Sequence, residues 1–292
     1  CVGICPYNFP ALVPMWLYPL ARACGNTCSL EPSEKVPLTG VRLIELLQQA
    51  GLPKGVLNVV HGGKQCVDAL LTHPKIRAIS FVGSSPVAKY KRVQAAGGAK
   101  NYVFVMPDAD FGNSVTGLVD AAFGCAGQRC MAGSTAVTIG KAADKLLPPL
   151  AEAVRAIKVG ATDRDPSAKM GAVISAQHRE KVASLVESSV KEGAELLVDG
   201  RGVKVPEHPK GFYLGPTIVD CVRQEMTIAK EEVFGPVLNI MRFEDLESAI
   251  EMSNRTIFGN GACIYTQSGK AAREFRHRIK SGMVGINVGV PA

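Results

Sequence analysis

The feature that most constrains the fold is an alternation of short apolar runs with amphipathic helical patterns in the first third of the chain. The strand-like and helical segments occupy, in turn, residues 2–5, 14–24, 27–30, 41–50, 56–60, 65–71 and 78–82. Such alternation is typical of βαβ units, whose strands lie side by side in a parallel sheet. We therefore predict an α/β fold.

One connection in this region is unusually short. Only Ser85–Tyr90 separates Ser84 from the next strand-like run, Lys91–Gln94. A crossover between parallel strands needs a dozen or more residues. Either these two strands are not parallel neighbours, or a piece of chain is missing here.

The composition indicates a globular chain, with 47% hydrophobic and 20% charged residues. The net charge of +7 is dispersed, and its densest cluster, residues 273–280, suits the solvated face of a helix better than a nucleic-acid patch. No apolar run is long enough to span a bilayer, and no secretory signal is visible. Nine cysteines include two C-x3-C pairs, but these lie in apolar runs. The odd count favours free thiols in a reducing compartment over zinc.

Cys130 is the candidate nucleophile. It follows an apolar helical pattern that Gly124 should end, and Gly127 gives the following backbone the freedom to turn. A thiol on such a loop can reach a cleft, and the adjacent Arg129 should stabilise its thiolate. The alternative is a small buried hydrophobic side chain, which is common for free cysteine.

Two further positions suggest chemistry. Asn8, in a polar turn between apolar runs, is a candidate amide donor to a developing oxyanion, although an ordinary turn asparagine is the alternative. Gly83-Ser84 follows a strand and precedes Pro86, so it predicts a helix N-terminus able to hold a phosphate.

Seven motifs occur in order along essentially the whole chain. They are Pro6-Tyr7-Asn8-Phe9-Pro10, Pro32-Ser33-Glu34, Ser80-Phe81-Val82-Gly83-Ser84, Gly98-Ala99-Lys100-Asn101, Val105-Met106-Pro107-Asp108-Ala109, Gly127-Gln128-Arg129-Cys130-Met131-Ala132 and Glu231-Glu232-Val233-Phe234-Gly235-Pro236. With these motifs the chain resembles the aldehyde dehydrogenase family. Within that family it is most similar to the coenzyme A-acylating methylmalonate-semialdehyde branch.

The resemblance implies an aldehyde dehydrogenase fold, with a partial Rossmann-like NAD-binding domain in residues 1–99 and an α/β catalytic domain in residues 100–292. It implies Cys130 as nucleophile, with Asn8 and the backbone N–H of Cys130 as the oxyanion hole. Arg129 falls where this branch holds the substrate carboxylate. No metal is implied. The implied cofactor-binding positions are Cys5, Tyr7, Glu31, Glu34, Lys35, Gly83, Ser84, Gly97, Glu232 and Phe234.

The implied reaction oxidises methylmalonate or malonate semialdehyde with NAD through a cysteine thioester. The acyl group loses carbon dioxide and passes to coenzyme A, giving propionyl-CoA or acetyl-CoA. Hydrolytic relatives carry a glutamate where this chain has Ala95, so attack by water should be slow. Glu31 replaces a family lysine, and its carboxylate should favour NAD over NADP.

Two other functions stay open: a catalytically inactive fragment that serves as a binding module, and a general hydrolytic aldehyde dehydrogenase. Family members form dimers or tetramers, extend beyond both ends of this chain and carry a longer helical connection between Tyr90 and Lys91. We expect a small-molecule semialdehyde substrate and neither nucleic acid nor membrane as a partner. The resemblance places the protein in the mitochondrial matrix if it is eukaryotic and in the cytoplasm if it is bacterial.

Overall fold

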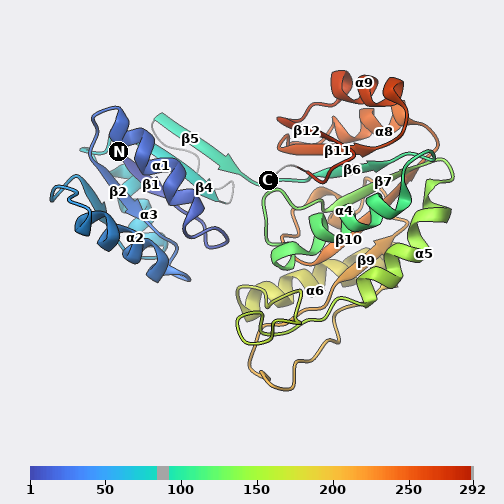
Figure 1. Cartoon of the computed structure of the whole chain (residues 1–292), viewed down its shortest axis with the longest axis horizontal. Coiled ribbons are helices and arrows are strands. Elements are labelled where there is room, and N and C mark those ends of the chain that lie inside the picture. The colour runs from blue at the N-terminus through green and yellow to red at the C-terminus, as the bar shows by residue number, and fades with distance from the viewer. Residues whose placement is uncertain (84–91, 291–292) are drawn as a thin grey trace. The chain divides into compact units, whose positions relative to one another are not determined.

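The computed structural model describes residues 1–83 and 92–290, and it divides the chain into two compact units (Figure 1). Unit 1 is Cys1–Gly98 and unit 2 is Ala99–Ala292. The division falls one residue before the boundary expected from the sequence. Each unit has its own sheet and its own hydrophobic core.

Unit 1 is built on a five-stranded sheet in the order β3-β2-β1-β4-β5, in which every neighbouring pair is parallel. The predicted parallel α/β arrangement is therefore confirmed. The elements in chain order are β1 (Val2–Ile4), α1 (Leu12–Ala23), β2 (Cys28–Glu31), α2 (Pro37–Gln49), β3 (Leu57–Val59), α3 (Lys64–Thr72), β4 (Ala78–Gly83) and β5 (Arg92–Gly97).

Hydrophobic side chains cover both faces of this sheet. One cluster joins Val13 of α1 and Ile44 of α2 to Leu30 of β2. The other joins Leu71 of α3 to Ile79 of β4. Since alternate residues of a strand point to opposite faces, the helices lie on both sides of a doubly wound sheet. In such sheets, ligands bind at the carboxyl ends of the strands, where the strand order reverses.

Strands β4 and β5 are parallel neighbours, paired from Ala78 opposite Arg92 to Gly83 opposite Gly97. The first alternative for the short connection, that these strands are not parallel neighbours, is therefore wrong. The connection itself lies outside the described residues. The predicted phosphate-binding position Ser84 lies outside them as well.

Unit 2 contains a seven-stranded sheet in the order β12-β11-β6-β7-β10-β9-β8, parallel throughout except for the β8–β9 pair. Its strands are β6 (Tyr102–Val105), β7 (Thr135–Ile139), β8 (Glu195–Val198), β9 (Thr217–Asp220), β10 (Val237–Phe243), β11 (Gly261–Tyr265) and β12 (Met283–Ile286). Its helices are α4 (Phe111–Phe123), the 3-10 turn η2 (Gly124–Gly127), α5 (Ala142–Arg155), α6 (Ala176–Lys191), α7 (Thr227–Lys230), α8 (Leu246–Ser253) and α9 (Gly269–Arg278).

The core of unit 2 centres on β6. Phe104 is fully buried and meets the ring of Phe275 from α9 edge to face, with 4.8 Å between ring centroids. Helix α5 packs against α4 and β7 and continues through Pro148 and Pro149. A rigid, well-packed sheet of this kind holds the loops at its edges in fixed positions.

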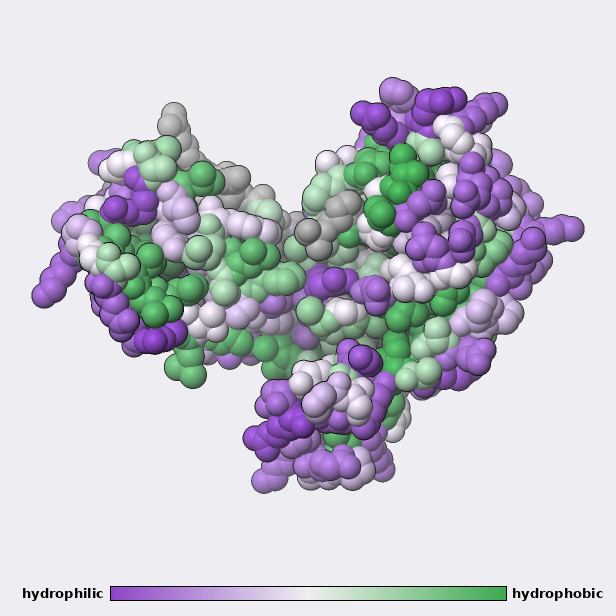
Figure 2. Space-filling view, viewed as in Figure 1, coloured by the Kyte–Doolittle hydropathy of each residue, from purple (hydrophilic) through white to green (hydrophobic). Residues whose placement is uncertain are grey.

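The surface agrees with the charge pattern. Hydrophilic side chains cover α9 (Figure 2), where Arg278 bonds to Glu247 and Glu274, as expected of a solvated helix face. On α1, by contrast, Trp16 and Leu20 are exposed. Within residues 1–83 and 92–290, no helix is long and apolar enough to cross a membrane, and no three His, Cys, Asp or Glu residues are grouped to hold a metal ion. All nine cysteines are free.

Candidate active site

The segment that carries the candidate nucleophile begins with a strained turn. Helix α4 ends at Phe123, as the glycines predicted, and Cys125, Ala126 and Gly127 then have φ angles of 53°, 52° and 68°. Two non-glycine residues in the left-handed region store strain, which is typical of functional sites. A Cβ on Gly127 would lie 2.0 Å from the carbonyl oxygen of Gly235. Only glycine therefore lets this turn approach the loop before β10.

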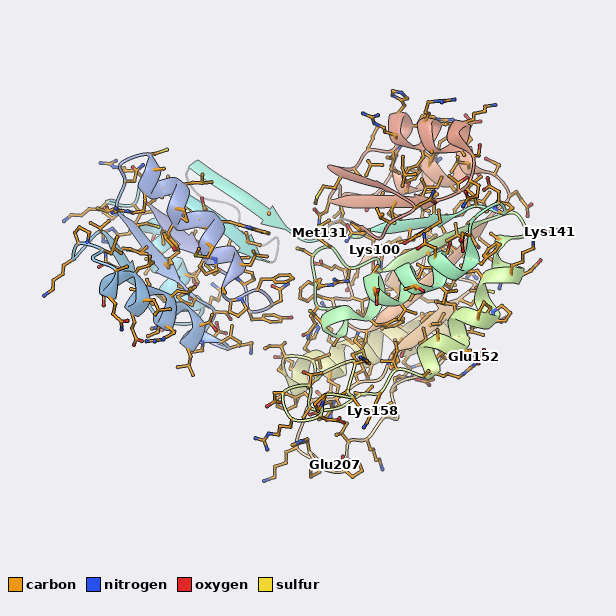
Figure 3. The ribbon with its side chains drawn as sticks, in the orientation of Figure 1. Lys100, Met131, Lys141, Glu152, Lys158 and Glu207 are labelled. Atoms are coloured by element: carbon orange, nitrogen blue, oxygen red, sulfur yellow. The ribbon has the colours of Figure 1, made fainter. Side chains whose placement is uncertain are left out.

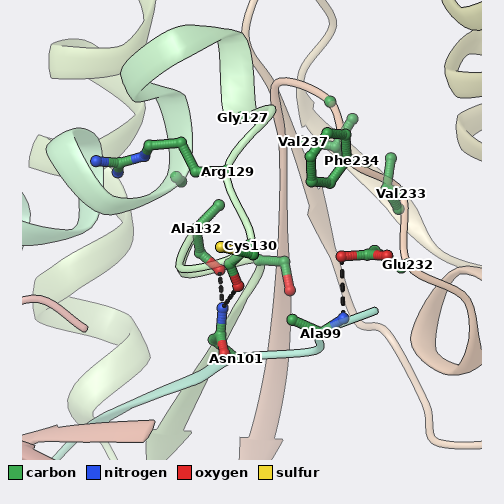
Figure 4. Close-up of a pocket in the computed structure, with 13 residues that line it drawn as sticks. Ala99, Asn101, Gly127, Arg129, Cys130, Ala132, Glu232, Val233, Phe234 and Val237 are labelled. Atoms are coloured by element: carbon green, nitrogen blue, oxygen red, sulfur yellow. Dashed lines mark hydrogen bonds between the residues drawn. The ribbon is translucent and has the colours of Figure 1, made fainter. Parts of the chain in front are cut away.

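Cys130 follows this turn and lines a small pocket together with three other predicted site residues, Arg129, Glu232 and Phe234 (Figure 4). Most pocket residues come from segments that precede strands: 99–101 before β6, 127–134 before β7 and 232–235 before β10, with Ala122 of α4 and Val237 of β10 completing the lining. Because these three strands are parallel neighbours, their amino ends meet at one edge of the sheet. That edge brings together residues more than 100 positions apart in the sequence.

The Cys130 thiol is half-buried, and burial raises its pKa above the ordinary cysteine value. The backbone N–H groups of Cys130 and Met131 lower the pKa, while the carboxylate of Glu232 raises it. The attraction of Arg129 comes after all of these in size. The expectation that Arg129 stabilises the thiolate therefore holds in direction, since its charge lowers the pKa of Cys130, but desolvation outweighs it and the pKa is raised overall.

Arg129 is bonded to a helix end. Its Nη2 donates to the carbonyl oxygens of Asp120 at 2.7 Å and Ala121 at 3.0 Å, in the last turn of α4. The partial negative charge of a helix C-terminus attracts a cation, and Figure 4 shows the guanidinium directed away from the Cys130 sulfur. Its Nε is buried and has no hydrogen-bond partner among the described residues. Binding of a substrate carboxylate by Arg129 stays a prediction.

Ala99 and Lys100 connect the start of β6 to the loop before β10. The N–H of Ala99 donates to Oε1 of Glu232 at 3.0 Å. Lys100, labelled in Figure 3, is 3% exposed, and its Nζ donates to the carbonyl oxygens of Ile228 at 2.6 Å and Glu231 at 2.9 Å. Burial lowers the pKa of Lys100 to about 7, although the charges of Glu232 and Glu231 act to raise it. Burial also raises the pKa of Glu232. These bonds fix the Glu232 carboxyl at the pocket.

Two asparagines converge on the nucleophile's own carbonyl. Nδ2 of Asn101 donates to the carbonyl oxygens of Cys130 and Ala132, both at 2.8 Å, and its Oδ1 accepts from the N–H of Gly261 at 3.0 Å. Nδ2 of Asn260 donates to the same Cys130 oxygen at 2.8 Å. The backbone that carries the thiol is thus held by amides from the starts of two adjacent strands, β6 and β11.

His178 holds the loop on which Phe234 lies. Ser175 caps α6 by accepting from the N–H of His178, which places the imidazole one turn into the helix. Its Nε2 lies 2.7 Å from the carbonyl oxygen of Phe234, whose φ is 53°. Burial lowers the pKa of His178, so the neutral ring with a proton on Nε2 donates this bond.

The sequence interpretation assigned no role to Lys100, Asn101, His178 or Asn260. Lys100 and Asn101 lie in a motif that was recognised, but the motif does not state which carbonyls they reach. No sequence signal marks His178 or Asn260. Their partners are distant in the chain, up to 130 residues away for Asn260 and Cys130.

The other predicted site residues lie in unit 1, at the carboxyl edge of its sheet. Cys5, Glu31, Gly83 and Gly97 lie at or directly after strand ends, and the loops that follow carry Tyr7, Asn8, Glu34 and Lys35. This is the edge at which doubly wound sheets bind ligands. Asn8 and Cys130 belong to different units, so their joint oxyanion hole stays a prediction.

Two buried groups at this edge have raised pKa values. Burial raises the pKa of the Cys5 thiol to about 12, so it stays protonated and unreactive. Glu31 is 3% exposed at the end of β2, and burial together with the nearby Glu34 raises its pKa to about 7. An acid at the end of the second strand is where doubly wound sheets contact the ribose of a dinucleotide.

A doubly wound parallel unit followed by a second α/β unit with a loop-borne cysteine places the chain in the two-unit α/β class. The sequence pattern of the aldehyde dehydrogenase family matches residues 1–292. The chain belongs to the aldehyde dehydrogenase family, as the motifs suggested.

Similar proteins cover nearly the whole chain. Malonate-semialdehyde dehydrogenase 1 of Oceanobacillus iheyensis is 51% identical over 299 residues, which cover 99% of this chain and 61% of that protein. A Sinorhizobium meliloti structure, assigned as a methylmalonate-semialdehyde dehydrogenase complexed with NAD, superposes with a TM-score of 0.97 at 44% identity and covers 100% of this chain and 61% of its own. The methylmalonate-semialdehyde dehydrogenase of Oceanimonas doudoroffii gives 0.96 at 48%, covering 100% and 62%. The chain thus spans about three-fifths of the length of these relatives.

Proposed function

We propose that this chain oxidises a malonate-type semialdehyde with NAD and passes the acyl group to coenzyme A. The observation that carries the proposal is the position of Cys130, a half-buried thiol on a strained loop in a pocket shared with Glu232 and Phe234. Relatives named for malonate semialdehyde at about half identity support the substrate class.

The carboxyl edge of unit 1 fits NAD. Glu31 offers a buried carboxyl to ribose hydroxyls at the end of β2, and a carboxylate there disfavours a 2′-phosphate. Gly83 ends β4 at the same edge, and a Cβ there would lie 2.6 Å from the ring of Phe81, so only glycine fits beside that ring. When bound, NAD accepts the hydride from the substrate.

Cys130 forms the covalent bond to the substrate. The thiolate adds to the aldehyde carbon and gives a thiohemiacetal, whose oxyanion needs donors that are already in place. The Cys130 N–H and the amide of Asn8 are the proposed donors. Oxidation of the thiohemiacetal leaves an acyl thioester on Cys130.

Loss of the thioester to water should be slow. Ala95 stands where hydrolytic relatives carry a glutamate. The carboxylate among the pocket-lining residues that the structure describes belongs to Glu232, and it already accepts from the N–H of Ala99. Thiolysis by coenzyme A, after loss of carbon dioxide, therefore releases the acyl group.

Arg129 is proposed to bind the substrate's carboxylate. It lines the pocket, and its buried Nε lacks a hydrogen-bond partner among residues 1–83 and 92–290. A carboxylate would supply that partner and a charge-assisted bond. The guanidinium would keep its bonds to the end of α4 through Nη2.

The test is a single turnover without coenzyme A. The purified chain is mixed with malonate semialdehyde and NAD, and NADH formation is followed beside Cys130→Ala. We expect a burst near one NADH per chain that the variant lacks, with steady turnover after coenzyme A is added.

Each other outcome has a distinct meaning. Steady turnover without coenzyme A would favour the hydrolytic alternative. No burst from folded chain that binds NAD at equilibrium would overturn the proposed activity and favour the binding module. Acetyl-CoA, identified by mass spectrometry, verifies the decarboxylating route.

A further inference from the structure

The carbonyl oxygen of Cys130 accepts two side-chain amides at once. Asn101 and Asn260 each place Nδ2 at 2.8 Å from it. The orientation of the Asn101 amide is fixed independently, because its Oδ1 accepts from the N–H of Gly261 while its Nδ2 also reaches the carbonyl of Ala132. Asn101 is 1% exposed, so this bonding is shielded from water.

These two asparagines reach one oxygen because of the sheet. Asn101 directly precedes β6 and Asn260 directly precedes β11, and these strands are parallel neighbours with Ala262 opposite Tyr102. Their side chains therefore start from adjacent positions at the amino edge of the sheet. The Cys130 carbonyl is anchored to this rigid edge.

A peptide unit is planar and trans, so its carbonyl oxygen and the following N–H point in opposite directions. Anchoring the Cys130 oxygen on one side thereby turns the Met131 N–H to the other. The backbone N–H groups of Cys130 and Met131 lower the pKa of the Cys130 thiol. The amides thus act on the thiol through the peptide between them.

We propose that Asn101 and Asn260 are positioning residues for the nucleophile, which orient the Cys130–Met131 peptide so that its N–H, that of Met131, faces the sulfur. They touch neither substrate nor cofactor in this role. The catalytic meaning of the inference rests on the proposed function of Cys130. The bonding itself is testable without substrate or cofactor.

The experiment measures the rate at which iodoacetamide alkylates Cys130 as a function of pH. Trypsin cleaves after Lys100, Arg129, Lys141, Arg255 and Lys270, which places Cys125, Cys130 and Cys263 on three separate peptides. Mass spectrometry then follows each thiol in one sample. Exposed Cys125 reports general reactivity, and fully buried Cys263 stays unlabelled while unit 2 is folded.

The variants are Asn260→Ala and Asn101→Ala, with Asn254→Ala as the matched control. Asn254 also donates Nδ2 to a backbone carbonyl at 2.8 Å, that of Arg278, and does not line the pocket. In Asn260→Ala and in Asn101→Ala we expect the Cys130 pH profile to move upward and the alkylation rate of Cys130 at pH 7.5 to fall about 3- to 10-fold. Cys125 should react as in the unmodified chain, and Asn254→Ala should leave both thiols unchanged.

An Asn260→Ala profile that coincides with the unmodified chain, with Cys263 still protected, overturns the inference. If Asn260→Ala labels Cys263, Asn260→Leu decides, because it keeps the side-chain volume and lacks the donor. If the alkylation profile of a variant moves but its burst of NADH is unchanged, the asparagines orient the thiol without affecting catalysis. Only the catalytic part of the inference is then rejected. If the unmodified chain itself gives no burst, the proposed activity fails, and the alkylation profiles of the variants still decide the inference separately.

Discussion

The imidazole Nε2 of His178 lies 2.7 Å from the carbonyl oxygen of Phe234, and the two rings meet edge to face at 6.5 Å between centroids. The bond joins α6 to a turn in which Phe234 has a φ of 53°. A side chain in the left-handed region costs energy unless its surroundings hold it. His178 therefore helps to keep Phe234 and the neighbouring Glu232 at the pocket.

We expect His178→Phe, which keeps a ring and removes the donor, to weaken NAD binding about tenfold, the value of one hydrogen bond to a loop carbonyl. His178→Gln retains an N–H donor and should bind nearly as the unmodified chain does. Fluorescence titration of NADH measures both. Equal affinities for the two variants would contradict a role for the hydrogen bond.

Gly127→Ala should destabilise unit 2 by about 3 kcal/mol or more, since a Cβ would overlap a backbone carbonyl and the residue has a positive φ. The added atom would lie 2.0 Å from the Gly235 oxygen, at a φ of 68°. Gly202→Ala is the control, because nothing lies within 4 Å of its Cβ position and its φ is not in the left-handed region. Urea unfolding compares them, and similar midpoints would refute the close approach.

Glu31→Gln should stabilise the chain at pH 8 by about 1–2 kcal/mol, and the effect should fade as the pH falls towards 4.5. The folded pKa of Glu31 is raised to about 7, so between its unfolded value and pH 7 the folded state holds the extra proton. Stability from this group is therefore present at low pH and is lost as the pH rises through 7. Urea unfolding at pH 5, 6, 7 and 8 measures it.

The exposed Glu207 provides the control for this series, since Glu207→Gln removes a carboxyl from solvent. Its effect on unfolding should stay near zero at every pH. A Glu31→Gln difference that is equally large at pH 5 and pH 8 would show that Glu31 titrates normally.

Lys100→Met should destabilise the chain by about 2 kcal/mol at pH 7, because two buried carbonyls lose their donor. The folded pKa of Lys100 is lowered to about 7. Above that pH the unfolded lysine binds a proton that the folded one does not, so the unmodified chain gains stability relative to the variant as the pH rises.

Denaturant unfolding at pH 7, 8 and 9 follows this difference, with the exposed Lys141→Met as the control (Figure 3). The difference in unfolding free energy between Lys141→Met and the unmodified chain should stay constant over these three pH values. A penalty for Lys100→Met that stays constant from pH 7 to pH 9 would mean that the buried ammonium keeps its proton.

Local signals predicted much of the fold. The helix that ends before Gly124 and the parallel sheet of unit 1 follow from glycine, apolar runs and alternation. The proline-containing helix α5 was harder to predict, since buried Leu146 and Leu150 stabilise it against its own prolines. Packing overrode propensity there.

The candidate site, too, was predicted in part from the sequence and decided in part by the tertiary structure. Motifs pointed to Cys130, Glu232 and Phe234, and the structure places all three at one pocket. They also suggested that Arg129 activates the thiol. In the structure the guanidinium is bonded to the end of α4, and burial dominates the pKa of Cys130. A sequence neighbour is a poor guide to a spatial neighbour, because adjacent side chains diverge.

The sequence by itself determined the family, the α/β class and the identity of the candidate nucleophile, because these depend on local patterns and residue types that can be read from the order of residues. The tertiary structure decided what surrounds that thiol. Asn101 and Asn260 meet at the Cys130 carbonyl only because β6 and β11 pair, and Lys100 reaches its carbonyls only because unit 2 buries it. Desolvation and directional hydrogen bonds depend on distances in space, which the order of residues does not contain.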